Sequence, residues 1–480
     1  MRFTEPLWTA REIARVVAGR TDGRWFADGI AIDSREVIPG DLFVALAGAH
    51  ADGHDFVAEA LAAGAAGALV SAPAPDVDGA DPRLIHVADT AIALRALGEA
   101  ARRRIAGRVA AVTGSAGKTS VKETLRRALG RDALAHANIR SFNNHVGVPL
   151  SLARMPRAAR YAVFELGTSA PGEIAPLSRL VAPDVAIVTA VGSAHAGAFT
   201  DERAIADEKA GIFEGVAKGG TAVLDIDHAH GSYLLEQATA RGLEVLSVSL
   251  EDAGADIRPL RLKRCADVSC MTADIAGVLA TVKVGVPGRH WVRNALLVLG
   301  AVKALGGDIG LAGLSLAELR APAGRGRRWR VPLRDGDLFL IDDAYNANPL
   351  SLAAAFEAVA DIAPTQSGRR IAVLADMAEL GDEAAALHRS LAPQLARAGF
   401  TEVVAIGPLM AMLAEEAGVA ATSCADAAAA LDHLARRLRA GDLVLVKGAN
   451  AAGLSRVVDG IRALGGRHMT TSRHATLAAE

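Results

Sequence analysis

Short runs of apolar, mostly β-branched residues recur along this chain and alternate with longer alanine-rich stretches. Runs that are apolar on both faces and separated by helices indicate parallel sheets buried between helical layers. The runs that carry this pattern lie at 108–113, 161–166, 184–191, 221–225, 338–342, 371–376 and 443–448. We therefore expect an α/β fold built on parallel sheets.

The pattern changes twice along the chain, and each change suggests a domain boundary. Before residue 88 the apolar runs are shorter, with many glycines and aspartates between them, which indicates a separate small α/β domain. A segment rich in glycine, proline and arginine at 320–330 follows a helical stretch and is typical of a connector. We therefore predict three domains, at 1–88, 89–320 and 321–480.

Length and charge exclude several classes of protein. The chain has 480 residues and a formal net charge of −2, so no global basic field holds nucleic acid or an anionic membrane. No strongly apolar stretch is long enough to span a bilayer, and the N-terminus lacks the apolar segment of a secretory signal. The odd cysteine count disfavours a disulfide framework. We expect a cytoplasmic protein with neither nucleic-acid binding nor membrane insertion.

The strongest local signal is the sequence RVAAVTGSAGKTSVKETL, in which a strand, a glycine-rich turn and a helix follow one another. Gly114 and Gly117 allow backbone N–H groups to approach a phosphate, Lys118 can reach its oxygens, and the Thr119 hydroxyl can bind Mg²⁺. A chance glycine-rich turn is the alternative interpretation. The candidate phosphate loop consists of Gly114, Ser115, Ala116, Gly117, Lys118, Thr119 and Ser120.

Ligands of open parallel sheets gather at the carboxyl ends of the strands. Glu165 ends one predicted strand, His195 lies in the loop after another, and Lys209 follows in a helical stretch. The carboxylate and the imidazole could complete the Mg²⁺ shell that Thr119 begins. A helix-capping carboxylate, a solvated histidine and a surface lysine are the simpler interpretation.

Two further segments could contact a nucleotide. Arg325 lies in PAGRGRRWR, where its charge could stabilise a transferring phosphoryl group. A solvated basic linker, or a nucleic-acid patch with Trp329 as a stacking platform, would also explain this segment. Downstream, DDAYNANP places Asp343, Tyr345 and Asn346 at a strand end, where acceptors and a ring suit ribose and adenine. An ordinary turn after a strand is the alternative.

Taken together, these motifs resemble the ATP-dependent Mur ligases of peptidoglycan synthesis, over nearly the whole chain. GKT is shared with related folylpolyglutamate synthetases, whereas NNxxGVPL and DDxYNANP are more selective. The D-N-P-R motif of the diaminopimelate-adding and lysine-adding ligases is absent. The resemblance is carried by DSREVIPGDLFVALAG, DGHDF, GSAGKTSVKE, SFNNHVGVPLSL, FELGTSAPGEI, AHAGAFTDERAIADEKAGIF, PGRHWVRNAL, PAGRGR, DDAYNANP and VLADMAELG.

The resemblance implies a three-domain enzyme with a central P-loop parallel sheet and a C-terminal Rossmann-like domain. Its implied substrates are ATP, UDP-N-acetylmuramoyl-tripeptide and D-alanyl-D-alanine, joined through an acyl phosphate by a monomer that uses a pair of Mg²⁺ ions. It assigns catalysis to Lys118, His195, Lys209 and Arg325; metal binding to Thr119, Glu165, His195 and a possibly carbamylated Lys209; nucleotide contacts to Asn294, Arg325, Asp343 and Asn346; and substrate contacts to Ser34, Arg35, Asp52, His54, Asn143 and Asn144.

The chain departs from the family pattern at a few positions, and two other functions stay open. Trp291 replaces an asparagine of the usual G-x-H-N motif, and Ala449 replaces the serine of the usual K-G-S motif. Neither change touches the expected phosphate or metal set. An amide ligase with another acceptor, such as one acting on folate, would use the same fold, and a scaffold protein would bind ATP without turnover. The third residue of the tripeptide stays open.

Overall fold

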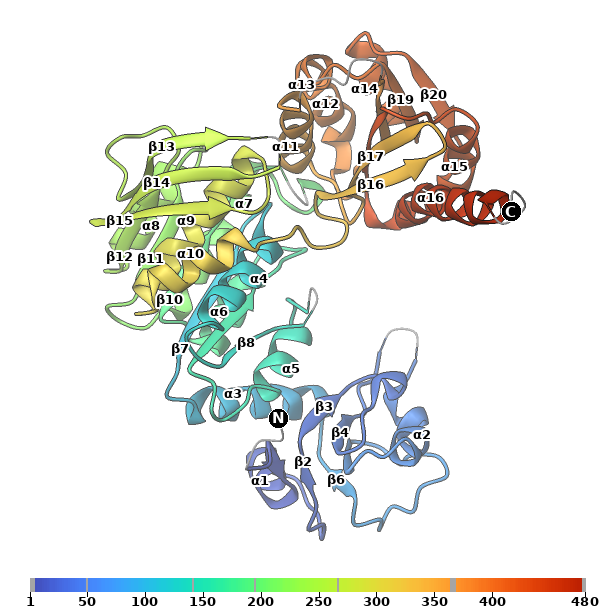
Figure 1. Cartoon of the computed structure of the whole chain (residues 1–480). Helices are drawn as coiled ribbons and strands as arrows, with labels where there is room; N and C mark the ends of the chain where they lie inside the picture. The colour runs from blue at the N-terminus through green and yellow to red at the C-terminus, as the bar shows by residue number, and fades with distance from the viewer. Residues whose placement is uncertain are drawn as a thin grey trace.

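The computed structural model of the chain describes residues 5–48, 51–139, 142–193, 196–265, 267–362 and 368–476, with side chains up to residue 465. Three α/β units follow one another, blue, cyan to yellow, and orange to red, in Figure 1. The central and third units meet near α11 (Pro349–Ala360), and the first unit extends from the other end of the central one. None of the described helices is long and apolar enough to cross a bilayer.

The first unit is built on a parallel sheet of the order β3-β4-β5-β6. Its apolar strands are buried between helices, as the short runs before residue 88 predicted. The strands are β3 (Gly29–Ala31), β4 (Asp41–Val44), β5 (Gly67–Val70) and β6 (Leu84–His86), beside an antiparallel pair, β1 (Trp8–Thr9) and β2 (Phe26–Ala27). The helices are α1 (Ala10–Val16) and α2 (Val57–Ala62).

Helix α3 (Thr90–Arg104) links the first unit to the central one. Asp89 caps its N-terminus by accepting hydrogen bonds from the N–H groups of Ala91 and Ile92, at 2.7 and 2.9 Å. Its apolar face packs in one cluster with strands of the first unit and with α5 (Gly147–Ala153). The Trp8 indole N–H donates to the carbonyl of Ala153 at 2.9 Å. A continuous apolar core therefore joins the two units.

The central sheet has nine strands in the described chain, in the order β15-β14-β13-β12-β11-β10-β7-β9-β8. The strands are β7 (Arg108–Thr113), β8 (Ala135–Ala137), β9 (Tyr161–Glu165), β10 (Val185–Val188), β11 (Thr221–Asp225), β12 (Glu244–Val248), β13 (Ile257–Arg264), β14 (Ser269–Ile275) and β15 (Val278–Val284). Strands β7 to β12 pair in parallel, which confirms the predicted P-loop sheet.

The last strands of this sheet differ from the predicted parallel arrangement. Strands β13, β14 and β15 pair antiparallel with one another. Alternate residues of β14 are buried, and the others are partly or fully exposed. Such alternation is typical of an antiparallel sheet with one face in water, and it replaces the continuous apolar run that parallel strands show.

Helices cover both faces of the central sheet. One buried cluster lies under α4, α9 and α10, and a second lies under α6, α7 and α8. The helices are α4 (Lys118–Leu129), α6 (Ile174–Val181), α7 (Glu202–Ala210), α8 (Gly231–Ala240), α9 (Arg289–Ala304) and α10 (Ile309–Ala317).

The third unit has a sheet of the order β16-β17-β21-β18-β19-β20, parallel except for the edge strand β16. Its strands are β16 (Arg327–Leu333), β17 (Gly336–Asp343), β18 (Arg370–Ala375), β19 (Glu402–Ile406), β20 (Ala421–Cys424) and β21 (Leu443–Lys447). Its other helices are α12 (Ala384–Arg389), α13 (Ala392–Arg397), α14 (Pro408–Glu416), α15 (Ala427–Ala435) and α16 (Ser455–Thr476). The ends of β17 and β21 face the phosphate loop across one cavity.

Candidate functional site

The glycine-rich segment forms a tight loop between β7 and α4. Gly114 and Gly117 adopt φ angles of 143° and 88°, a region that residues with a side chain rarely occupy. A Cβ on Gly114 would lie 1.9 Å from the Thr189 hydroxyl oxygen. The Ser115 N–H donates to the carbonyl of Ala190 at 2.8 Å, and this hydrogen bond anchors the loop. Its shape therefore depends on glycine at both positions and on the segment that follows strand β10.

The Lys118 ammonium lies inside this loop and donates to the carbonyl of Gly114 at 2.6 Å. Burial lowers the pKa of Lys118; the negative charge of Glu165 opposes that shift, and the positive charge of Arg325 adds to it. The lysine is therefore held near another cation in a poorly solvated place. A bound polyanion would relieve this repulsion, as expected for a phosphate site.

Glu165 ends β9 and is 2% exposed. Its two carboxylate oxygens accept hydrogen bonds from the Thr119 hydroxyl and from the Asn143 amide, both at 2.8 Å. Its own N–H donates to the side-chain oxygen of Asn138 at 2.9 Å. The structure thus brings together Thr119 and Glu165, which the sequence assigned to one metal, and adds Asn143 to them.

Lys209 is also buried, at 2% exposure, in the last turn of α7. Burial lowers the pKa of Lys209 well below its usual value, and the charge of Lys118 lowers it further, against the opposing effect of Glu208 and Glu173. Lys209 is not among the described residues that line the cavity. The simple interpretation as a surface lysine is therefore wrong, and an uncharged amine is favoured.

His195, which the sequence assigned to metal binding and catalysis, lies outside the residues that the structure describes. Within the described ranges, no group of three or more histidine, cysteine, aspartate or glutamate side chains is placed to hold a metal. The expected set has only one such member in the described part, Glu165, besides a hydroxyl and a lysine.

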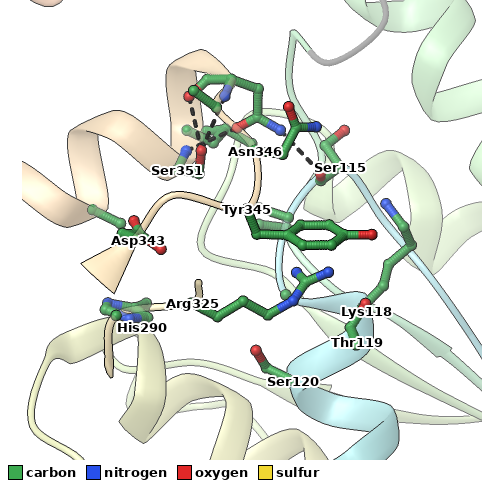
Figure 2. Close-up of a pocket in the computed structure, with 18 of the residues that line it drawn as sticks. Ser115, Lys118, Thr119, Ser120, His290, Arg325, Asp343, Tyr345, Asn346 and Ser351 are labelled. Atoms are coloured by element: carbon green, nitrogen blue, oxygen red, sulfur yellow. Dashed lines mark hydrogen bonds between the residues drawn. The ribbon is translucent and has the colours of Figure 1, made fainter. Parts of the chain in front are cut away.

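Arg325 reaches the phosphate loop from the third unit. Its guanidinium carbon lies 4.0 Å from the centre of the Tyr345 ring. In Figure 2 the side chain extends beneath this ring toward Lys118 and Ser120. The interpretation of Arg325 as a solvated linker residue is therefore not supported by its position.

An ion pair lies behind this arginine, where β17 and β21 end. The Lys447 ammonium lies 2.7 Å from a carboxylate oxygen of Asp343 and donates to the carbonyl of Asn346 at 3.0 Å. Burial raises the pKa of Asp343, although Lys447 opposes the shift. Sequence reasoning assigned Asp343 and Asn346 to the nucleotide site, whereas it noted Lys447 only as the first residue of the altered K-G-S motif. Its position as the last residue of a buried strand was the available signal.

These groups surround one cavity of about 570 Å³ between the central and third units. Most of the residues expected at the nucleotide site line it. From the sequence set, the cavity is lined by Ser115, Ala116, Gly117, Lys118, Thr119, Ser120, Asn143, Asn144, Glu165, Asn294, Arg325, Asp343 and Asn346. Gly114 does not line the cavity, but its backbone carbonyl accepts a hydrogen bond from the Lys118 ammonium. Figure 2 shows the phosphate-loop residues opposite the Asp343–Asn346 segment.

A direct hydrogen bond crosses this cavity at its edge. The Asn348 amide donates to the backbone carbonyl of Ser115 at 3.1 Å, while its oxygen caps α11 by accepting from the Ser351 N–H at 2.9 Å. One side chain therefore fixes the start of a helix of the third unit against the phosphate loop. In the sequence Asn348 was noted only as part of DDAYNANP, so neither its helix cap nor its contact with Ser115 was predicted.

His290 and Arg328 also line the cavity and were not in the predicted set. Burial lowers the pKa of His290 to about 4, and nearby Lys447, Arg293 and Arg328 add to the shift. His290 is therefore a neutral hydrogen-bonding group at neutral pH. Asn294 lies on the same helix, and its side-chain oxygen would be 3.1 Å from a Cβ on Gly117.

The four residues predicted in the first unit lie apart from this cavity. His54 is 4% exposed, and its Nε2 accepts from the N–H of Ser71 at 2.9 Å, so Nδ1 carries the proton and donates to Asp52 at 2.6 Å. Ser34 is buried and donates to Glu59. Arg35 is exposed and pairs with Asp33 at 2.6 Å. The side chain of His54 is therefore engaged by partners of its own unit, whereas Arg35 is exposed.

The fold and the cavity define a P-loop nucleotide-binding protein whose phosphate loop faces a third α/β unit. Three family models match the chain: the Mur ligase family catalytic domain at 27–102, the Mur ligase middle domain at 112–302 and the Mur ligase glutamate ligase domain at 327–450. The chain belongs to the Mur ligase family.

Individual relatives cover nearly the full chain. A UDP-N-acetylmuramoyl-tripeptide–D-alanyl-D-alanine ligase from Escherichia coli is 32% identical over 94% of this chain and 97% of its own. The Bacillus subtilis enzyme of the same name is 32% identical over 85% and 87%. A crystal structure of MurF from Acinetobacter baumannii, 28% identical, superposes with a TM-score of 0.83 over 95% of this chain and 99% of that one.

A solved structure with a nucleotide is also similar. MurF ligase from Thermotoga maritima in complex with ADP is 26% identical and has a TM-score of 0.76, over 92% of this chain and 98% of its own.

Proposed function

We propose that this chain joins D-alanyl-D-alanine to UDP-N-acetylmuramoyl-tripeptide at the expense of ATP, as the named relatives do. The observation that carries the proposal is the single cavity in which the phosphate loop, buried Glu165 and Arg325 converge from two units. The absence of the D-N-P-R motif separates the chain from ligases that add an amino acid earlier in the same peptide. The product is the pentapeptide precursor of peptidoglycan, with ADP and phosphate.

The reaction needs activation because a carboxylate is a poor electrophile. The terminal carboxylate of the tripeptide attacks the γ-phosphorus of ATP, the bond to the β-bridging oxygen breaks, and ADP leaves. The free amine of D-alanyl-D-alanine then attacks the acyl carbonyl, the bond to the phosphate oxygen breaks, and the amine loses a proton. Lys118 and Arg325 would offset the repulsion between two anionic reactants.

Thr119 and Glu165 fit a Mg²⁺ site. Their oxygens already lie 2.8 Å apart, and hydroxyl and carboxylate oxygens are the ligands that Mg²⁺ prefers. The two residues, with His195, would hold the ion, which when bound would neutralise charge on the phosphate oxygens. Asn143 would keep the carboxylate oriented through its own hydrogen bond at 2.8 Å.

Lys209 is suited to carry a carbamate. An amine adds to CO₂ only when it is uncharged, and burial together with Lys118 favours the uncharged form. The addition of CO₂ to the uncharged amine forms a nitrogen–carbon bond, releases one proton and leaves an anionic carbamate. Intact-protein mass spectrometry at neutral pH in bicarbonate would detect the added CO₂, and Lys209→Arg should not carry it.

The remaining assignments follow the family. We infer that 1–88 holds the UDP end of the substrate with Ser34, Arg35, Asp52 and His54, that 89–320 binds ATP and that 321–480 binds nucleotide and dipeptide. Because His54 and Asp52 are engaged with each other, we expect Arg35 to make the direct contact and His54 to support its domain. The enzyme would act as a monomer in the cytoplasm, where UDP-linked substrates and ATP are available.

The test is phosphate release from ATP and Mg²⁺ with UDP-N-acetylmuramoyl-tripeptide, with and without D-alanyl-D-alanine, followed by product mass. Release that depends on both substrates, with a mass gain of one dipeptide, is expected for a diaminopimelate or a lysine tripeptide. Lys118→Ala should abolish ligation in a folded protein. Nucleotide binding without phosphate release from either tripeptide would refute the assignment and favour another acceptor amine or a scaffold.

A further inference from the structure

The loop that carries Arg325 is tied to the end of β17 by backbone hydrogen bonds. A carboxylate oxygen of Asp342 accepts from the Gly324 N–H, and its backbone carbonyl accepts from the Gly326 N–H, both at 2.9 Å. The Tyr345 N–H donates to the carbonyl of Gly324 at 3.0 Å. The residues on both sides of Arg325 are therefore held by the strand that also carries Asp343.

The backbone of the loop approaches Tyr345 closely at Gly324. Gly324 and Gly326 adopt φ angles of 71° and 82°. A Cβ on Gly324 would lie 2.9 Å from the Tyr345 Cβ. A side chain at position 324 would therefore displace Tyr345. Asp342 is itself 6% exposed, so water competes weakly for its hydrogen bonds.

Tyr345 also contacts the arginine side chain. The guanidinium carbon of Arg325 lies 4.0 Å from the ring centre, a distance at which the ring face attracts a cation. Figure 2 shows the ring above the guanidinium, which extends toward the phosphate loop. An arginine side chain has many rotamers, and a covering ring reduces them before any nucleotide binds.

We propose that Asp342 and Tyr345 are positioning residues for Arg325. The inference rests on the proposed function, in which Arg325 meets the transferring phosphoryl group. Asp342 fixes the backbone on both sides of the arginine, and Tyr345 fixes the direction of its side chain. Preorganised charge stabilises a transition state better than charge that must be ordered during the reaction. One face of the Tyr345 ring thus packs against the Arg325 guanidinium instead of an adenine ring.

A double-mutant cycle tests this inference. Tyr345→Leu should lower kcat for ligation about tenfold, the range of one cation–π contact with a partly buried arginine, with little change in KM for the tripeptide substrate. In an Arg325→Ala background the same substitution should change kcat less than about twofold, because its target is gone. Tyr345→Phe should rescue the rate, since it keeps the ring.

A matched control and a second variant guard against simple misfolding. The ring of Tyr233 covers Arg203 at 3.5 Å outside the cavity, and its hydroxyl donates to Asp207. Tyr233→Leu therefore removes a comparable cation–ring contact and should leave the ligation rate unchanged. Asp342→Asn should lower kcat in the Arg325 protein and far less in the Arg325→Ala protein. Equal effects of Tyr345→Leu in both backgrounds would overturn the inference and show that Tyr345 acts on the nucleotide itself.

The same cycle, measured as affinity for Mg²⁺ and a non-hydrolysable ATP analogue by calorimetry, separates this inference from the proposed function. Coupling between positions 345 and 325 in analogue binding, without ligation of D-alanyl-D-alanine by the unmodified chain, would refute the function and retain the positioning role. Ligation with no coupling in either assay would retain the function and refute the positioning role.

Discussion

The buried pair of Lys447 and Asp343 offers the sharpest energetic test of this structure. Lys447 is 2% exposed, lies 2.7 Å from Asp343 and donates to Asn346 at 3.0 Å. Lys447→Met keeps most of the side-chain volume and removes the charge. Asp343, whose side chain is 18% exposed, would then be a partly buried carboxylate without its ammonium partner, and an unpaired charge of this kind is costly.

The free energy of folding lost in Lys447→Met depends on whether Asp343 stays charged or takes up a proton. Removing one partner of a buried pair typically costs about 3 to 5 kcal/mol. The carboxylate can instead take up a proton, which at pH 7 costs at most about 4 kcal/mol from an unfolded pKa near 4. We therefore expect a loss of up to about 4 kcal/mol at pH 7, because Asp343 is partly exposed and the charge of Arg325 also acts on it. Because burial raises the pKa of folded Asp343, the loss should shrink by about 1.4 kcal/mol for each unit that the pH falls.

Hydrogen exchange of the intact protein is the suitable assay, because a chain of three units does not unfold in one step. The slowest amides of β17 and β21 should exchange up to about three orders of magnitude faster in Lys447→Met at pH 7. Lys218→Met, at an exposed position, is the matched control. Adding Asp343→Asn to Lys447→Met should restore most of the protection.

Two results would refute this reasoning. An acceleration below about tenfold at pH 7 would mean that the pair contributes less than about 1.4 kcal/mol. A loss that stays constant between pH 5 and pH 8 would mean that Asp343 is not the group left without a partner.

The remaining predictions concern other parts of the site. Glu165→Gln should raise the Mg²⁺ concentration needed for half-maximal phosphate release at least about tenfold, since a carboxylate beside Thr119 is lost; unchanged Mg²⁺ dependence would remove it from the metal site. Asn348→Ala should cost about 1 kcal/mol through its lost helix cap and raise KM for ATP through its lost bond to Ser115, whereas Asn348→Ser should restore stability alone. Burial raises the pKa of Asp225 to about 6, so its charging opposes folding as the pH rises from about 4 to 6. Relative to Asp225→Asn, the unmodified protein should lose about 3 kcal/mol over that range, measured by hydrogen exchange of the slowest amides of β11, and parallel pH curves for the two proteins would contradict this.

Much of the architecture was predictable because its signals are local. Continuous apolar runs predicted strands such as β7, β9 and β18, since a strand buried on both faces must be apolar at consecutive positions. The phosphate loop was predictable for a similar reason, because its strand, glycines and lysine adjoin in sequence. Glu165 was predictable from its place at a strand end.

The antiparallel strands β13 to β15 were not predicted, since their half-exposed faces interrupt the apolar runs. The sequence analysis named Lys209 as a candidate site residue, but the polar segment DEKA around it did not predict that Glu208 and Lys209 are both buried.

The sequence by itself determined the phosphate loop, the parallel α/β class and the candidate residues at strand ends, because each depends on neighbours along the chain. Only the tertiary structure decided which of those residues meet. Lys447 reaches Asp343 because β21 lies beside β17 in the sheet order, and Asn348 reaches Ser115 because α11 starts beside the phosphate loop. Charges distant in sequence become partners only when folding brings their strand ends to one poorly solvated edge, where an unpaired charge is costly.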